Sequence, residues 1–190
     1  MSLRMNFLYP KIPLANLRAM FGQALIGAIL AGVYGIAHDQ VTYSISQEYF
    51  TRLKFLQFRY ANFGFPPRIF VAEIGFLASW WVGFFCAWFI ARITVPAFPR
   101  SVAFHQTLNG ILIVFGFAFA GSISGYLFGV LHGSDFSAWE QLAAIHQVVD
   151  VPSFVRVAYI HDATYLGGLT GLLAAIFHVW RVKRSNQPGK

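Results

Sequence analysis

Charged residues are scarce in this sequence. Asp, Glu, Lys and Arg make up 11% of the 190 residues, whereas a soluble globular domain has about 25% charged residues. Acidic residues are the scarcer kind, 7 against 14 basic ones. A chain so poor in charge is not expected to be a soluble domain. Its net charge of +7 does not indicate nucleic-acid binding, because the basic residues are spread along helix ends, where they anchor in lipid headgroups.

Cysteine is nearly absent too. Cys86 is the only one and lies among Phe and Trp residues, so no internal disulfide can form, and a small apolar filler is expected there. The sequence has no Cys-x-x-Cys pair, no phosphate-binding glycine loop and no hydrolase elbow. Ser122 and Ser124 lie in a glycine-rich run, where their hydroxyls are expected to bond to the preceding helical turn rather than act as nucleophiles.

Apolar residues dominate what is present. They account for 57% of the chain, and the mean hydropathy is +0.57. A helix that crosses a membrane needs about 20 apolar residues, and four runs reach that length: 17–38, 69–91, 105–132 and 157–180. The first is predicted to be a retained helix, because it is longer than the roughly 7–15 apolar residues of a signal core. We therefore predict an all-α, polytopic membrane protein in which residues 1–190 form one four-helix bundle.

Two long connections, 39–68 and 133–156, are predicted to be outer loops that contain short interfacial helices. Basic residues mark the cytoplasmic side of a membrane protein. The side with both termini carries nine basic residues and no acid: Arg4, Lys11, Arg18, Arg92, Arg100, Arg181, Lys183, Arg184 and Lys190. The outer side carries all seven acids: Asp39, Glu48, Glu73, Asp135, Glu140, Asp150 and Asp162. Both termini are therefore predicted to be cytoplasmic, and in a bacterium the loops face the periplasm.

Small residues recur at four-residue spacing in three of the spans: Gly27, Ala31 and Gly35; Gly121, Gly125, Gly129 and Gly133; and Gly167, Gly171 and Ala175. Lipid tails provide no hydrophobic drive for helix association, so small residues that permit backbone contact favour it. We predict that the first, third and fourth spans meet through these faces. The second span carries six bulky aromatic residues and is expected at the periphery: Trp80, Trp81, Phe84, Phe85, Trp88 and Phe89.

Two His-Asp pairs, each followed by Thr-Tyr, stand beside glycine-rich runs in "HDQVTY" (38–43) and "HDATY" (161–165). At 100° per residue, the histidines of the first, third and fourth spans flank the small-residue faces. Ionisable residues within a span are costly and usually pair, line a cavity or serve function. Three imidazoles and a carboxylate suit Zn, Fe or Cu. The predicted metal ligands, near the outer end of the bundle, are His38, Glu73, His132 and His161.

Asp39 and Asp162 are predicted to support these ligands by accepting a hydrogen bond from an imidazole N–H. Neighbours on a helix point apart, so each aspartate is expected to serve a histidine of another helix and not the one before it. The alternative is a structural hydrogen-bond network that fixes the loops to the helix ends. The sequence leaves open whether the protein is an enzyme.

Two further interpretations remain. One is a non-catalytic or assembly subunit, whose outer loops dock a membrane-protein partner or a second copy. The other is an electron carrier, because His105 and His178 near the cytoplasmic edge are a candidate ligand pair for a b-type haem. In every case the lipid bilayer is the surrounding partner.

The stretch "HDQVTYSISQEYFTRLKFLQF" at 38–58, followed by "FGFPPR" at 63–68, resembles a group of bacterial integral membrane proteins with no assigned activity. "YIHDATYLGGL" at 159–169 is similar to their last helix. The resemblance covers about residues 20–180. It implies a bacterial cytoplasmic membrane and a four-span arrangement, and it transfers no functional residue.

Overall fold

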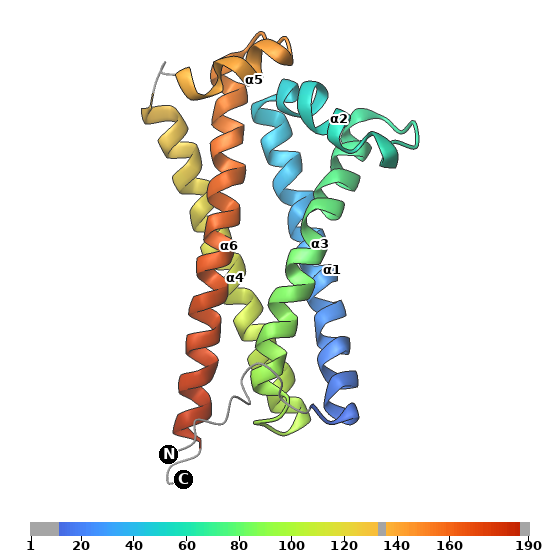
Figure 1. Ribbon diagram of the computed structural model, residues 1–190, viewed down its shortest axis with the longest axis vertical. Helices are drawn as coiled ribbons and strands as arrows, with labels where there is room; N and C mark the ends of the chain where they lie inside the picture. The colour runs from blue at the N-terminus through green and yellow to red at the C-terminus, as the bar shows by residue number, and fades with distance from the viewer. Residues whose placement is uncertain (1–11, 133–135, 187–190) are drawn as a thin grey trace.

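The computed structural model describes residues 12–132 and 136–186, and four long antiparallel helices dominate it (Figure 1). Each is long and apolar enough to cross a membrane. They are α1 (Leu14–Ile45), α3 (Pro67–Thr94), α4 (Arg100–Leu131) and α6 (Val151–Ser185). The described residues contain no strand. The predicted all-α four-helix bundle is confirmed.

Proline and carboxylate groups set the helix beginnings. Pro13, Pro66 and Pro99 immediately precede α1, α3 and α4, and a proline has its φ fixed near the helical value while lacking an N–H that would need a partner. At the start of α6, the Asp150 carboxylate accepts a hydrogen bond from the Ser153 N–H at 3.2 Å. The residues after Asp39 contain no helix breaker, so α1 continues to Ile45 and Asp39 lies in the helix, not in the predicted outer loop.

Short helices cap one end of the bundle. Between α1 and α3 lie the π-helix η1 (Tyr49–Lys54), α2 (Phe55–Gln57) and the 3₁₀ turn η2 (Arg59–Ala61); before α6 lie η3 (Ser137–Trp139) and α5 (Glu140–Ile145). Both groups lie at the end opposite the start of α1 and the end of α6 (Figure 1). The Glu48 carboxylate accepts a hydrogen bond from the Asp150 N–H at 2.7 Å and so links the two groups of short helices. The short helices predicted for both outer loops are present, and this end of the molecule is called the capped end below.

The bundle is built from two tightly packed pairs, α1 with α3 and α4 with α6 (Figure 1). In the first pair, a Cβ on Gly35 would collide with the carbonyl oxygen of Gly75, and one on Gly27 with that of Gly83. In the second pair, a Cβ on Gly125 would collide with the carbonyl oxygen of Tyr159. Backbone therefore touches backbone within each pair, which is the contact that small residues permit.

The prediction that the second span is peripheral is wrong for one of its faces. Gly75 and Gly83 of α3 pack directly on α1, and eight-residue spacing places them on one side of the helix. The aromatic face behaves as predicted, since Trp81 and Phe85 are about half exposed. The small residues of α1 consequently meet α3 and not α4 or α6, while Gly133 lies outside the described residues.

The interface between the α1–α3 pair and the α4–α6 pair is called the seam. Toward the uncapped end it is apolar, with a cluster of Cys86, Ile90, Val114, Ala175 and Val179. Cys86 is buried there as an apolar filler, as expected. Toward the capped end, α1 faces α6 through polar side chains.

Candidate functional site

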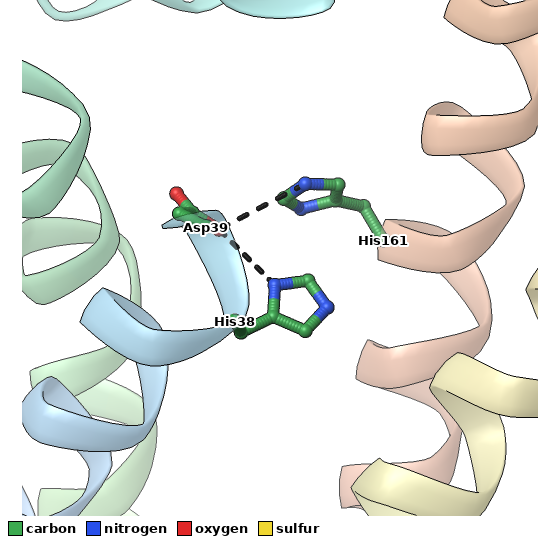
Figure 2. Close-up of side chains that lie close together, drawn as sticks. All are labelled: His38, Asp39 and His161. Atoms are coloured by element: carbon green, nitrogen blue, oxygen red, sulfur yellow. Dashed lines mark hydrogen bonds and ion pairs between the residues drawn. The ribbon is translucent and has the colours of Figure 1, made fainter. Parts of the chain in front are cut away.

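His38 and Asp39 of α1 meet His161 of α6 across the seam (Figure 2). Asp39 is 3% exposed and His161 is 7% exposed, whereas the His38 side chain is 11% exposed. The three are brought together because α1 continues as a helix past residue 39 and α6 begins well before residue 161. These buried ionisable groups lie inside two apolar helices, where such groups are costly unless paired or functional.

A single carboxylate oxygen faces both rings (Figure 2). Asp39 Oδ1 lies 3.1 Å from His38 Nδ1 and 3.8 Å from His161 Nε2. The two imidazole rings are perpendicular, with centroids 4.8 Å apart. The expectation that Asp39 cannot serve the preceding histidine is therefore wrong. The bond forms because both side chains are long enough to reach toward α6, although their Cα–Cβ bonds diverge by about 100°.

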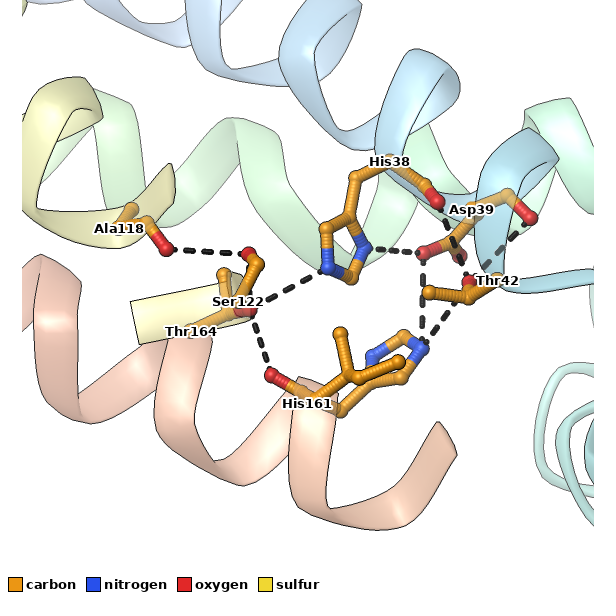
Figure 3. A network of polar contacts seen from close by, with 8 residues as sticks. His38, Asp39, Thr42, Ala118, Ser122, His161 and Thr164 are labelled. Atoms are coloured by element: carbon orange, nitrogen blue, oxygen red, sulfur yellow. Dashed lines mark hydrogen bonds and ion pairs between the residues drawn. The ribbon is translucent and has the colours of Figure 1, made fainter. Parts of the chain in front are cut away.

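The threonine of each His-Asp motif contacts the histidine of the other motif (Figure 3). Thr164 Oγ1 lies 3.2 Å from His38 Nε2, and Thr42 Oγ1 lies 3.4 Å from His161 Nε2. Both hydroxyls are also within reach of carbonyls of their own helices. This reciprocal pairing accounts for the shared His and Thr of the two motifs; of the two aspartates, Asp39 lies against the histidines.

A line of hydrogen bonds continues from His38 to α4 (Figure 3). Thr164 Oγ1 lies 2.7 Å from Ser122 Oγ, and Ser122 is 3.0 Å from the Ala118 carbonyl. Each hydroxyl carries one proton, so which group donates at each step depends on the tautomer of His38. The bond from Ser122 to Ala118, like that from Ser124 to Ala120, fits the role expected of both serines.

Aromatic rings hold the imidazoles in place. Tyr49 of η1 stacks on His161 with centroids 5.0 Å apart and planes 23° apart. Tyr34 of α1 stacks on His38 at 6.0 Å and 24°. π-Helical turns such as η1 are frequent at functional sites, and this one places Tyr49 over the ring of His161.

Lys54 and Asp162 complete the charge distribution. Lys54 lies in η1 and lines the same cavity as Asp39 and His161. Burial lowers the pKa of the Lys54 ammonium, and the negative charges of Asp39 and Asp162 partly restore it. Burial raises the pKa of the Tyr49 phenol, and the charges of Asp162 and Asp39 raise it further. A half-buried amine therefore interacts through its charge with two carboxyl groups at the capped side of the site.

A small cavity of about 30 Å³ lies between these side chains, lined by His38, Asp39, His161, Lys54, Tyr34 and Tyr165 among others. A cavity holds a water molecule when its volume exceeds about 10–15 Å³. The space therefore suits a water molecule or a single ion. It has no room for a porphyrin between the two imidazoles.

The three groups have the spacing of metal ligands. One atom from each of His38, Asp39 and His161 can be chosen so that all three lie within 4.8 Å of one another. Nitrogen and oxygen ligands about 2.05 Å from tetrahedral Zn²⁺ are about 3.3 Å apart. The measured 3.1 and 3.8 Å from Asp39 Oδ1 to the two histidines bracket that separation. The widest separation in the group, up to 4.8 Å, exceeds that value, so the side chains would have to move closer together to hold one ion.

His132, the second predicted histidine ligand, lies elsewhere. It follows the end of α4 and is exposed, stacked on Phe128 with centroids 4.9 Å apart. Gly125 opposes Tyr159 in this antiparallel pair, so the backbone at His132 is level with the first turn of α6, about nine residues or 13 Å from the level of His161. The His132 ring reaches back to lie edge-on to Tyr159, with centroids 6.1 Å apart. His132 therefore lies on the predicted face of α4 but at a different depth along the bundle.

Glu73, the predicted carboxylate ligand, lies at the depth of His38 but on another side of its helix. Gly35 opposes Gly75, so Glu73 is level with the residue before His38. It is seven residues from Trp80, however, and so lies on the same side of α3 as that residue, although Glu73 itself is half-buried. One Glu73 carboxylate oxygen is buried without a hydrogen-bond partner, and within the described ranges Glu73 forms no ion pair.

The remaining predicted residues lie outside the three-residue group. Asp162 is exposed and acts on Lys54 and Tyr49 through its charge. His105 and His178 are both exposed near the uncapped end, and His105 packs edge-on against Phe104. Sequence reasoning missed Lys54 and Tyr49, whereas the threonines were visible in the repeated motif.

Comparisons of the chain with protein-family models, with curated proteins and with solved structures found no match. The site must therefore be interpreted from its own chemistry.

Proposed function

We propose that this protein is a multi-pass protein of a bacterial cytoplasmic membrane that binds a transition-metal ion through His38, Asp39 and His161. The observation that carries the proposal is the set of three possible ligand atoms within 4.8 Å of one another, on residues buried between two membrane-spanning helices. Both termini are proposed to be cytoplasmic, because basic residues without acids gather at the uncapped end. The metal site then lies toward the periplasmic side.

The ligand set favours Zn²⁺ or Fe²⁺. Two imidazoles and one carboxylate form the usual protein ligands of a catalytic zinc or of a non-haem iron with open positions. The contact between Thr164 and His38 Nε2 at 3.2 Å supports the assignment, because a ligating imidazole donates its other N–H to an oxygen that fixes the ring. The cavity beside the three groups provides space for a water molecule as a further ligand.

Elemental analysis of detergent-purified protein tests the proposal. After exposure to Zn²⁺ or Fe²⁺ and removal of excess ion, wild-type protein should retain about one equivalent per chain. His161→Ala and Asp39→Asn should lose it. His132→Ala is the matched control, because it removes an imidazole that lies outside the group, and it should bind metal like wild type.

Folding must be verified on each sample by circular dichroism and size-exclusion chromatography. If folded wild-type protein retains no more of any transition metal than folded His161→Ala does, the proposal is wrong. If His132→Ala loses the metal as His161→Ala does, the ligand set is wrong.

A further inference from the structure

A second, larger space adjoins the metal centre. A groove of about 520 Å³ runs between α1 and α4, with Ile160 of α6 also in its lining. It lies within the range of about 300–1,000 Å³ that small-molecule sites have. Val41 and Ile123, from opposite walls, are 63% and 47% exposed. Because these walls belong to membrane-spanning helices, the groove opens sideways toward the lipid, and a ligand would enter it from the bilayer.

The groove has a polar end at the metal centre. His38 lines both the groove and the small cavity, so its ring is the partition between them. Ser122 also lines the groove and is linked to Asp39 through Thr164 and His38 by contacts of 2.7, 3.2 and 3.1 Å. A ligand head bonded to Ser122 would therefore join a continuous line of hydrogen bonds that ends at the Asp39 carboxylate.

The lining indicates a neutral head. The described residues that line the groove include one histidine, His38, and no Lys, Arg, Asp or Glu. The Arg156 guanidinium lies 5.8 Å from the Tyr126 ring centroid but is not part of the lining. A phosphate or carboxylate head at Ser122 would therefore have no cation in the lining to balance it, which is costly away from water. Hydroxyl and imidazole groups instead suit a head with uncharged oxygens.

The lining also indicates a flat head. Tyr34, Phe119 and Tyr126 line the groove. Phe119 and Tyr126 are 60% and 40% exposed, whereas Tyr34 already stacks on His38 and Phe115 with centroid distances of 6.0 and 5.2 Å and offers a ligand its edge. Aromatic side chains favour a planar ring by offset or edge contacts. Isoprenoid quinones and quinols combine these features: uncharged oxygens, a planar ring and an apolar tail.

We infer that the groove between α1 and α4 binds a lipid-soluble quinone or quinol, with its ring beside Tyr34 and a ring oxygen at Ser122 and His38. Binding of this ligand class does not require the metal. Only its position beside a metal centre rests on the proposed function.

Calorimetric titration of the full-length protein in detergent with decylubiquinone tests the inference, with 1-decanol as a probe that has the same chain and no ring. Decylubiquinone should give a saturable isotherm and 1-decanol none. Ala37→Phe and Ile123→Trp fill the groove from opposite walls and should each weaken binding by about tenfold or more. Ala120→Phe, at an exposed position of α4 outside the lining, should leave the affinity within about twofold.

Metal content is measured on the same samples and should not change in Ala37→Phe. The inference is overturned if decylubiquinone gives no saturable binding, if 1-decanol binds as well, or if both groove-filling variants bind like wild type while folded. A wild type that binds decylubiquinone but no metal would overturn the proposed function and leave this inference standing.

Discussion

Backbone contacts hold each helix pair together, whereas side chains and cavities fill the seam between the pairs. Within α4–α6, Gly121 and Gly125 lie against the carbonyls of Ala163 and Tyr159. Across the seam, an added Cβ on Gly168 would meet no atom within 4 Å, and a cavity of about 70 Å³ lies beside it. A closely packed helix interface does not accommodate a larger side chain, whereas a loosely packed interface leaves room for ligands.

This difference explains where the polar groups lie. The pair interfaces have no space for an imidazole, because their backbones are in contact. The seam has that space, and His38, Asp39 and His161 occupy it. We therefore treat the pairs as the scaffold and the seam as the functional region.

The largest expected effect comes from adding one methyl group to each kind of interface. Gly125→Ala forces α4 away from Tyr159 of α6, so it should lower the free energy of unfolding by about 2 kcal/mol. Gly168→Ala, on α6 but at the seam, should be neutral or stabilising by up to about 1 kcal/mol, because alanine favours a helix more than glycine does. Unfolding in detergent, followed by circular dichroism, measures both. Equal losses would remove the distinction between pair and seam.

The sequence predicts the four spans well because hydropathy over about 20 residues is a strong signal. It does not predict the pairing. A small-residue stripe identifies a face suited to close contact, but it does not identify which helix will meet that face. Gly75 and Gly83 were overlooked because bulky aromatic residues surround them, although they contact Gly35 and Gly27.

The sequence places a residue at the site correctly only when it predicts both the helix face that the residue occupies and its depth along the bundle. His38 and His161 come together because both are correct. His132 has the right face at another depth, and Glu73 has the right depth on another face. Lys54 and Tyr49 reach the site from η1, and the path of a loop between two spans cannot be obtained from helical periodicity.

An intermediate effect is expected from replacing Lys54, the cation at the capped side of the seam. Lys54 lines the cavity with Asp39, so its positive charge opposes a metal ion there. Lys54→Met should tighten Zn²⁺ binding by about tenfold, the order expected for removing one charge from a partly buried site. Arg52→Met is the control, because Arg52 is exposed on the same η1 and does not line the cavity.

The pH dependence of this variant gives a second measurement. Lysine is charged below its pKa, and burial lowers the pKa of Lys54 from its ordinary value near 10.5. The affinity difference between wild type and Lys54→Met should therefore be largest at low pH and disappear as pH rises through that lowered pKa. Histidine protonation weakens binding in both proteins, so the ratio is compared from neutral pH upward. A ratio near unity at neutral pH would contradict the role assigned to Lys54.

The smallest expected loss of stability tests the reciprocal threonine contacts. Thr164→Val keeps the shape of the side chain but removes the hydroxyl between His38 and Ser122. The loss of these hydrogen bonds should lower the free energy of unfolding by about 1 kcal/mol, and the loss of support for His38 should weaken metal binding by about tenfold. Thr170→Val is the matched control on the same helix, because the Thr170 hydroxyl bonds only to the carbonyls of Leu166 and Gly167. If both variants lose the same stability and neither changes metal affinity, Thr164 is an ordinary helix residue, and the seam contains two histidines that Asp39 alone positions.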